Sequence, residues 1–501
     1  MQNRVVQLIF GLSMALVVAL SAQSTVFAED PKPIVPLTDP MAPFLESRAF
    51  AVSKGATNEF NKMEWMAVDT VNSKLYFVIS DQAKGMSDDK GVLKLKENRC
   101  GVIYVGDLDK DNNVSVLKPF IEGGPYNKEA KGDKCDLNNI ANPDSVFVDS
   151  AGNLWIGEDT SNHVNNILWR YNSKTKKLER FAILPAGAET TGFYATTACD
   201  VFVNIQHPSA MNPYPYNRGV FGVVNGFKST DSFTALPAPT GTITEMKVAK
   251  GGYQVLGRAG ELIPNEFRGQ RFVQINSIAG ATLNICNNPD GNMFLPTNKD
   301  ASEGYLYTNY ECQPGAVSKV YIKKNGQKWD VLEGENVDFA SVNGTWINCG
   351  ASVTPWHTAL TAEEYEPAAM LDSWKENVKT MNSYMGKQAN PYDYGFLVEL
   401  MPDTSGESFG SIVEKRYAMG RFAHEMGAFA ADKKTVYNGD DGAAGVFFKF
   451  VAAEAGNLSA GTLYAAAVTQ NTDGSLSIKW IELGKGKDED IAAAISAIKL
   501  P

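Results

Sequence analysis

One short pattern recurs along the chain and restricts its fold more than any other feature. An apolar strand is followed by a turn containing Asp or Asn, and then by a second strand rich in aromatic and β-branched residues, as in residues 65–78 and 146–156. This pattern is typical of antiparallel β-hairpins. Hairpins in series that form radial sheets around an axis make a β-propeller. We therefore predict an all-β propeller with six blades, elaborated with loops and a few helical insertions at residues 361–387 and 489–498.

The first 28 residues have the pattern of a secretory signal peptide. Arg4 precedes an apolar run over residues 8–20, and the small residue Ala28 precedes the acidic Glu29. The run is too short to anchor the chain in a bilayer. We expect export to the periplasm or out of the cell, no stable membrane insertion, and a single elaborated propeller domain over residues 29–501.

The net charge restricts the class of ligand, and the cysteines restrict the possible disulfides. A formal net charge of -11 disfavours nucleic-acid binding, which requires a basic face. We expect a monomer whose ligands are small molecules or metals. The six cysteines allow fifteen complete pairings, among which we favour Cys100 with Cys135 because both lie in polar loops of an exported chain.

Several glutamates stand next to predicted strands. Glu64 and Glu425 precede apolar strands, Glu311 follows one, and Glu363 and Glu364 end another. In a propeller such positions converge on one end of the axis, where their mutual repulsion would favour a bound cation. The alternative is that the five are solvated acids at the rim.

Other polar residues give weaker indications. Pro143 favours an extended Asn142, so that Asn142 and Asp144 would point the same way and offer oxygen ligands to calcium. The alternative is that both side chains hydrogen-bond to their own turn. His207, His357 and His424 stand at strand ends, where a ligand role and a structural role are both open.

Several segments resemble motifs of the PhoX-type alkaline phosphatases. They are Lys62-Met63-Glu64-Trp65, Gly420-Arg421-Phe422-Ala423-His424-Glu425, and residues 142–144, 204–208, 287–290, 309–311 and 348–364. The resemblance implies an exported propeller that hydrolyses small-molecule phosphate monoesters with calcium and iron. It also implies roles in catalysis for Lys62, Glu64 and Glu425, and in metal binding for Glu64, Asn142, Asp144, Glu311, Glu363, Glu364 and Glu425.

The chain departs from the family pattern in three ways. The motifs occur in a circularly permuted order, which a closed ring of blades tolerates. Ala362 stands where we expect the family's metal-binding cysteine, and Lys62 replaces an arginine. Of these departures, the missing thiolate at Ala362 favours calcium as the cofactor, with iron as the alternative. The departures leave open two other functions, a calcium-stabilised propeller that binds a ligand or partner without catalysis, and a metal-dependent lactonase.

Overall fold

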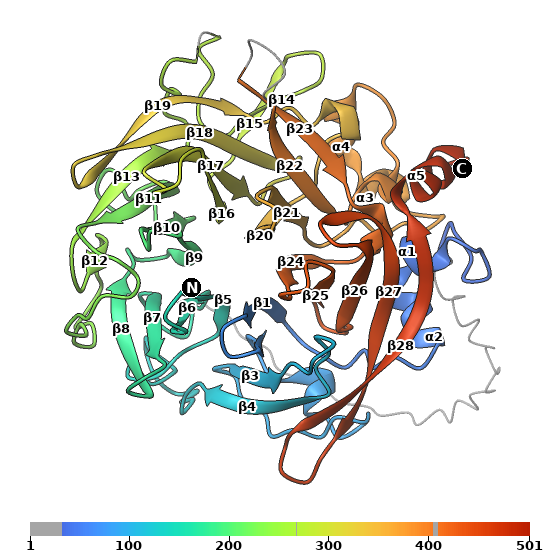
Figure 1. The fold of residues 1–501 in the computed structure, drawn as a ribbon, viewed down its shortest axis with the longest axis horizontal. Helices are drawn as coiled ribbons and strands as arrows, with labels where there is room; N and C mark the ends of the chain where they lie inside the picture. The colour runs from blue at the N-terminus through green and yellow to red at the C-terminus, as the bar shows by residue number, and fades with distance from the viewer. Residues whose placement is uncertain (1–32, 267, 404–408, 501) are drawn as a thin grey trace, which may run out of the picture.

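Antiparallel sheets are arranged as a ring around a central axis (Figure 1). The computed structural model describes residues 33–266, 268–403 and 409–500. The predicted signal peptide lies outside these described residues. The predicted all-β propeller is confirmed.

The strands follow one another outward from the axis in each sheet. The first sheet has β1 (Met63–Asp69), β2 (Lys74–Ile79), β3 (Val102–Asp107) and β4 (Val116–Glu122), and the second has β5 (Pro143–Val148), β6 (Leu154–Glu158), β7 (Ile167–Asn172), β8 (Lys177–Ile183) and β12 (Lys247–Val248). The third has β9 (Glu189–Ala195), β10 (Val201–Gln206), β11 (Val220–Asn225) and β13 (Gly252–Arg258), and the fourth has β16 (Pro289–Pro296), β17 (Glu303–Tyr310), β18 (Ala316–Asn325) and β19 (Lys328–Asn336). The fifth has β20 (Asn348–Val353), β21 (Ala359–Glu363), β22 (Leu397–Asp403) and β23 (Gly410–Lys415). The sixth has β24 (His424–Phe429), β25 (Thr435–Asp440), β26 (Phe448–Glu454), β27 (Asn457–Gln470) and β28 (Leu476–Lys487), and it is continuous with the first as one nine-stranded sheet.

The first strand of each sheet lines the axis. β1, β5, β9, β16, β20 and β24 contact one another in this cyclic order, and β24 returns to β1. The ring is also closed on its outside, because β28 pairs with β4 through Leu476 and Leu117. Closure of the ring brings the first and last sheets together, so residues far apart in the sequence meet at the axis.

The core lies between neighbouring sheets and is rich in aromatic side chains. Trp155 stacks on Phe193 across the second and third sheets, with ring centroids 4.6 Å apart. Phe77 and Phe447 meet edge to face across the first and sixth sheets, with centroids 4.9 Å apart. The aromatic and β-branched residues of the hairpin pattern therefore supply the packing between blades.

Five of the axial strands carry a β-bulge near their start. The register with the next strand shifts within the first four residues of β1, β5, β16, β20 and β24. A β-bulge places an extra residue in one strand, which interrupts the regular alternation of side chains between the two faces of the sheet. It therefore re-aims the second residue of each of these strands.

Close approach of the axial strands requires glycine at one of these bulges. A Cβ on Gly350 would lie 2.1 Å from the carbonyl oxygen of Glu425. We expect Gly350→Ala to lower the free energy of unfolding by about 1–3 kcal/mol through overpacking, measured by chemical denaturation. Gly252→Ala is the matched control because a Cβ there has no atom within 4 Å. Equal stability of the two variants would contradict the packing argument.

The helices lie outside the sheets. They are α1 (Ala42–Leu45), α2 (Ser47–Ser53), α3 (Trp374–Asn377), α4 (Lys379–Met385) and α5 (Asp488–Ala497), with 3-10 turns at Lys84–Met86, Ala340–Val342, Pro391–Asp393 and Tyr417–Met419, and a separate ribbon of β14 (Gln274–Asn276) and β15 (Thr282–Ile285). The two predicted helical stretches correspond to α3 with α4 and to α5. Within the described ranges, no helix is long and apolar enough to cross a membrane.

Two disulfides join loops. The predicted Cys100–Cys135 bond is confirmed, and Cys286–Cys312 is a second one. Cys199 and Cys349 carry free thiols. Cys349 is buried at the start of β20, which places it at the axis.

Candidate metal centre

Carboxylates and one thiol converge at the end of the axis where the axial strands begin. The second residues of the bulged strands are Glu64 in β1, Asp144 in β5, Asp290 in β16, Cys349 in β20 and Glu425 in β24, and Glu189 is the first residue of β9. The neighbouring antiparallel strands end at the same place. The residues that directly follow β6, β10, β17, β21 and β25 are Asp159, His207, Glu311, Glu364 and Asp441. The fold therefore repeats two positions, the start of the axial strand and the residue after its neighbour, to build a single site.

All of these residues except Asp290 and Asp441 line a cavity of about 200 Å³. It is lined by Lys62, Glu64, Asp144, Asp159, Glu189, Gln206, His207, Asn288, Glu311, Cys349, Glu364, Tyr365 and Glu425. Carboxylates dominate this set, and Lys62 is its one lysine or arginine among the described residues. Such a surplus of buried negative charge favours bound cations.

The ligand atoms fall into four groups in which they lie within 4.8 Å of one another. The groups are Glu64 with Asp144 and Glu425, Cys349 with Glu364 and Glu425, Asp290 with Glu311 and Cys349, and Asp159 with Glu189 and His207. Asp290 Oδ1 and Glu425 Oε1 are buried without a hydrogen-bond partner. Buried carboxylate oxygens without partners are costly in an empty protein but normal as metal ligands. The donor set therefore fits metal ions.

Burial and mutual repulsion change the protonation of the cavity. Burial, with the charge of Asp441 next in size, raises the pKa of Glu64 to about 8. Burial followed by neighbouring carboxylates also raises the pKa values of Asp144 and Glu425 well above the ordinary range. In the absence of a cation, part of the cluster is therefore protonated near neutral pH.

Lys62 lies at the edge of the cavity. Its Nζ is 3.1 Å from Glu64 Oε1 and 2.7 Å from Asp441 Oδ2, and it donates to the hydroxyl of Tyr365 at 2.8 Å. Burial lowers the pKa of Lys62, but the charges of Glu64 and Asp441 outweigh it, so that the net direction is upward. Lys62 and Tyr365 also hold left-handed backbones, with φ of 53° and 46°. Such strained positions concentrate at functional sites.

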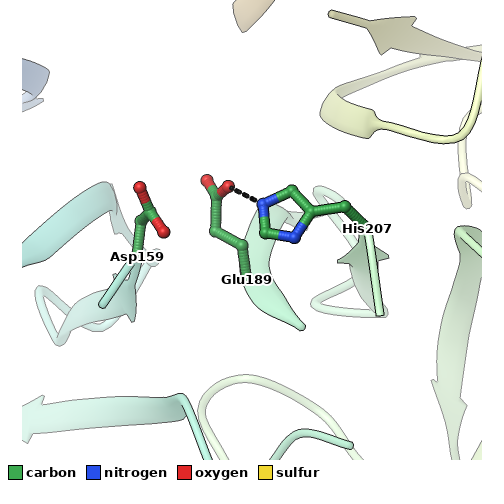
Figure 2. Close-up of side chains that lie close together, drawn as sticks. All are labelled: Asp159, Glu189 and His207. Carbon is green, nitrogen blue, oxygen red and sulfur yellow. Dashed lines mark hydrogen bonds and ion pairs between the residues drawn. The ribbon is translucent and has the colours of Figure 1, made fainter. Parts of the chain in front are cut away.

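The group of Asp159, Glu189 and His207 forms the open side of the cavity, where the three side chains point toward one another (Figure 2). His207 Nδ1 lies 3.1 Å from the carbonyl oxygen of Gly187, which requires a proton on Nδ1. Nε2 is 3.1 Å from Glu189 Oε2. A lone pair on Nε2 would face that carboxylate, so a cation, either a proton or a metal, belongs between them.

The sequence-based assignments of two residues are wrong. Glu363 is fully buried outside the cavity, where it accepts from Lys415 Nζ at 3.0 Å and from the backbone amides of Gly395 and Phe396. Glu363 is thus part of a buried ion pair and not a metal ligand. Successive side chains of a strand point to opposite faces, and Glu364 directly follows the last residue of β21. Glu364 therefore faces the cavity where Glu363 faces away from it.

Asn142 is not extended and does not point with Asp144. Its φ is 41°, its amide donates to the carbonyls of Ser80 and Arg99, and its Oδ1 accepts from Thr160 and Asn162. All hydrogen-bonding capacity of the side chain is used to join loops, so the prediction of a metal ligand is wrong. Asp144, by contrast, lines the cavity.

Two of the three histidines lie away from the ligand groups. His357 is exposed in the turn between β20 and β21, at the opposite end of β20 from Cys349. His424 stacks on Phe422, with centroids 3.7 Å apart, and its Nε2 donates to the carbonyl of Gly420. Burial lowers the pKa of His424 to about 4, so it is a neutral structural residue.

Ala362 lies outside the cavity, and the replacement of the family's cysteine at this position stays a prediction. Its side chain packs in an apolar cluster with Leu360, Phe396 and Leu397 and offers nothing to the cavity. The thiol comes from Cys349 instead, whose Sγ is 3.3 Å from Glu425 Oε2. The cavity therefore combines carboxylates with a soft ligand.

Five acidic or thiol residues that line the cavity or lie beside it carried no sequence-based assignment. They are Asp159, Glu189, Asp290, Cys349 and Asp441. A signal was present, because each residue either begins an axial strand of a hairpin or follows its second strand. Alignment of the hairpins with one another would have marked all five.

Sequence comparison identifies the family. The family model described as alkaline phosphatase PhoX matches residues 36–209 and 313–499, well over half of the chain. The chain belongs to this family. No curated protein matches it in sequence. The circular permutation of the PhoX motifs stays a prediction.

Solved structures give weaker likenesses. Pseudomonas fluorescens PhoX in complex with vanadate is 20% identical, with a TM-score of 0.33, and the match covers 46% of this chain and 54% of that one. A gluconolactonase from Xanthomonas campestris is 8% identical, with a TM-score of 0.38 and coverage of 83% and 93%. A protein of unknown function from Dyadobacter fermentans is 9% identical, with a TM-score of 0.41 and coverage of 85% and 97%.

Proposed function

We propose that this PhoX family member hydrolyses phosphate monoesters of small molecules at the axial cavity, with metal ions held by its acids and thiol. The observation that carries the proposal is the set of four ligand groups around one cavity with Lys62 at its edge. Phosphoryl transfer depends mainly on positive charge held in place around the transferred group. The residues of this cavity are suited to hold that charge.

The ligand groups differ in the chemical type of their donor atoms. The group of Glu64, Asp144 and Glu425 offers only carboxylate oxygens, which suit calcium, whereas the two groups that share Cys349 suit iron. Bound cations would stabilise negative charge on the phosphoryl oxygens and on an attacking water. Lys62 would bind a phosphate oxygen by exchanging one of its three partners, Glu64, Asp441 and Tyr365, since an ammonium has three N–H donors.

We also propose that the protein is exported. The two disulfides support this, because such bonds persist in oxidising compartments. Metals would then bind outside the cytoplasm, where calcium is available.

An assay tests the function. Purified protein is given a phosphate monoester, a phosphate diester and a lactone, each with and without added calcium or iron. We expect turnover of the monoester only, dependent on metal. Turnover of the lactone alone would establish the lactonase hypothesis, and binding of metal without turnover of any substrate would favour a non-catalytic propeller.

The assignment of Cys349 as an iron ligand gives a separate prediction. We expect Cys349→Ser to lower the iron bound per chain by at least about tenfold, because a hydroxyl is a much poorer iron ligand than a thiolate. Visible absorption from charge transfer between thiolate and iron should disappear with it. Cys199→Ser is the matched control because Cys199 is free and does not line the cavity. Equal iron in the two variants, or no iron in wild-type protein grown with iron, would contradict the assignment.

A further inference from the structure

Arg48 joins two segments that reach the axial cavity from different sheets. It lies in α2, and its guanidinium donates from Nε to Asp440 Oδ2 at 2.7 Å and from Nη2 to Asp440 Oδ1. Its Nη1 is 3.2 Å from Glu366 Oε1. Asp440 is the last residue of β25 in the sixth sheet, and Glu366 lies just beyond β21 of the fifth sheet. The planar fork of one arginine therefore bridges the two segments.

The two acids that Arg48 binds are the sequence neighbours of Tyr365 and Asp441, which contact Lys62. Lys62 Nζ is 2.7 Å from Asp441 Oδ2 and 2.8 Å from the hydroxyl of Tyr365, and this hydroxyl also donates to Asp441. Arg48 and Lys62 thus bridge the same two segments at adjacent positions. The separation that Arg48 sets between the segments therefore also sets the positions of these partners of Lys62.

A bound metal would not hold Tyr365 and Asp441 directly, because neither belongs to any of the four ligand groups. Asp441 is buried, whereas Tyr365 is 45% exposed and has a left-handed backbone, with φ of 46°. Trp346 Nε1 donates to the carbonyl of Tyr365 at 2.8 Å. The ion pair between Arg48 and Glu366 is a further tie on this exposed segment. It therefore limits the positions that the Tyr365 hydroxyl can take.

The backbone of Arg48 is itself fixed outside the ring of sheets. Ser47 Oγ accepts from the backbone amide of Arg421 at 2.9 Å and donates to the carbonyl of Pro43 at 2.8 Å. Ser47 and Ala51 are the buried residues of α2. The helix is thus docked on the segment that leads into β24, and Arg48 reaches from it toward the cavity.

We propose that Arg48 is a positioning residue of the phosphate site. By binding the acids beside Tyr365 and Asp441, it sets the position in which these two residues hold the ammonium of Lys62. Arg48 does not line the axial cavity and so acts through them. The inference rests on the proposed function, which places the phosphate beside Lys62. With Tyr365 and Asp441 fixed, Lys62 keeps both and exchanges Glu64 for a phosphate oxygen.

Calorimetry with methylphosphonate tests the inference, because its C–P bond is not hydrolysed. Protein loaded with calcium and iron is freed of excess metal and titrated. We expect Glu366→Met to weaken binding at least about tenfold, because it releases the Tyr365 segment and a misaligned charged hydrogen bond loses much of its strength. Arg48 keeps Asp440 in this variant, so no buried carboxylate loses its partner. The metal content should stay at the wild-type level.

A second variant and a matched control accompany Glu366→Met. Arg48→Met combined with Asp440→Asn removes the whole bridge without leaving a buried charge, and should weaken binding at least as much. Glu303→Met is the control, because Glu303 is a partly buried glutamate paired with Lys323 at 2.9 Å. Glu303 begins β17, and the cavity residue Glu311 follows the opposite end of that strand. The control should bind methylphosphonate as tightly as the wild type.

A double-mutant cycle separates positioning of Lys62 from a general structural effect. Glu366→Met should lower the affinity for methylphosphonate in the wild type and have no further effect in Lys62→Met, because it acts through this ammonium. An equal loss in both backgrounds would overturn the positioning role. A loss that accompanies a fall in metal content would overturn it as well, since the bridge would then act on the metal ligands.

The outcomes separate this inference from the proposed function. If Lys62→Met weakens the binding of methylphosphonate but neither variant of the bridge does, Arg48 has no positioning role and the phosphate site stands. If the wild type does not bind methylphosphonate, or Lys62→Met binds it as tightly as the wild type, the phosphate site beside Lys62 is overturned and the inference falls with it.

Discussion

Glu425→Gln is expected to lower metal affinity at least about a hundredfold and to reduce kcat/KM for a phosphate monoester by a similar factor. The expectation is large because Glu425 belongs to two of the four ligand groups, one with Glu64 and Asp144 and one with Cys349 and Glu364. An amide oxygen binds cations more weakly than a carboxylate. Elemental analysis and initial rates measure the two effects, and the melting temperature in chelator should not fall, because burial raises the pKa of Glu425 and so favours its neutral form in the metal-free protein.

Glu363→Gln provides a matched control with the opposite signature. This change leaves Lys415 buried without its carboxylate partner, at a cost of about 3–5 kcal/mol in the free energy of unfolding. Metal content should stay at the wild-type level, because Glu363 lies outside the cavity. Wild-type metal and activity in Glu425→Gln would show that the acids at the axis are only structural.

Removal of metal is expected to destabilise the protein in a pH-dependent way. A ligand present at about a thousand times its dissociation constant stabilises the native state by about 4 kcal/mol, so excess chelator should lower the melting temperature by several degrees at pH 8. In the metal-free protein, burial raises the pKa of Glu64 from 4.5 to about 8. The carboxyl then ionises more readily in the unfolded chain, so the metal-free protein should lose stability as the pH rises from 4.5 to about 8.

Thermal melts with and without chelator at pH 5 and pH 8 measure this. The difference between the two samples should be largest at pH 8 and small at pH 5, where the acids of the metal-free cavity are mostly protonated. Re-addition of calcium and iron should restore the melting temperature. An unchanged melting temperature at both pH values, with no metal in the purified protein, would show that the axial cavity is not a metal site.

The hairpin pattern was sufficient to predict the fold class. Alternation of apolar and polar residues around Asp and Asn turns is a local property, and it determined that hairpins such as β1–β2 and β5–β6 form. The radial arrangement was inferred from the repetition of these hairpins along the chain. The same local reasoning placed Glu64 and Glu425 at strand starts and favoured the Cys100–Cys135 disulfide.

Only the tertiary structure decided which polar side chains share the cavity. Glu363 and Glu364 are adjacent in the sequence, yet one pairs with Lys415 and the other faces the axis. Likewise the thiol comes from Cys349 at a bulge and not from the position of Ala362, which packs in the core. The physical reason is that side chains alternate with a period of two residues, so a bulge or a shift of one residue exchanges the two faces of a strand. Register and bulges are set by pairing between strands, which local sequence does not contain.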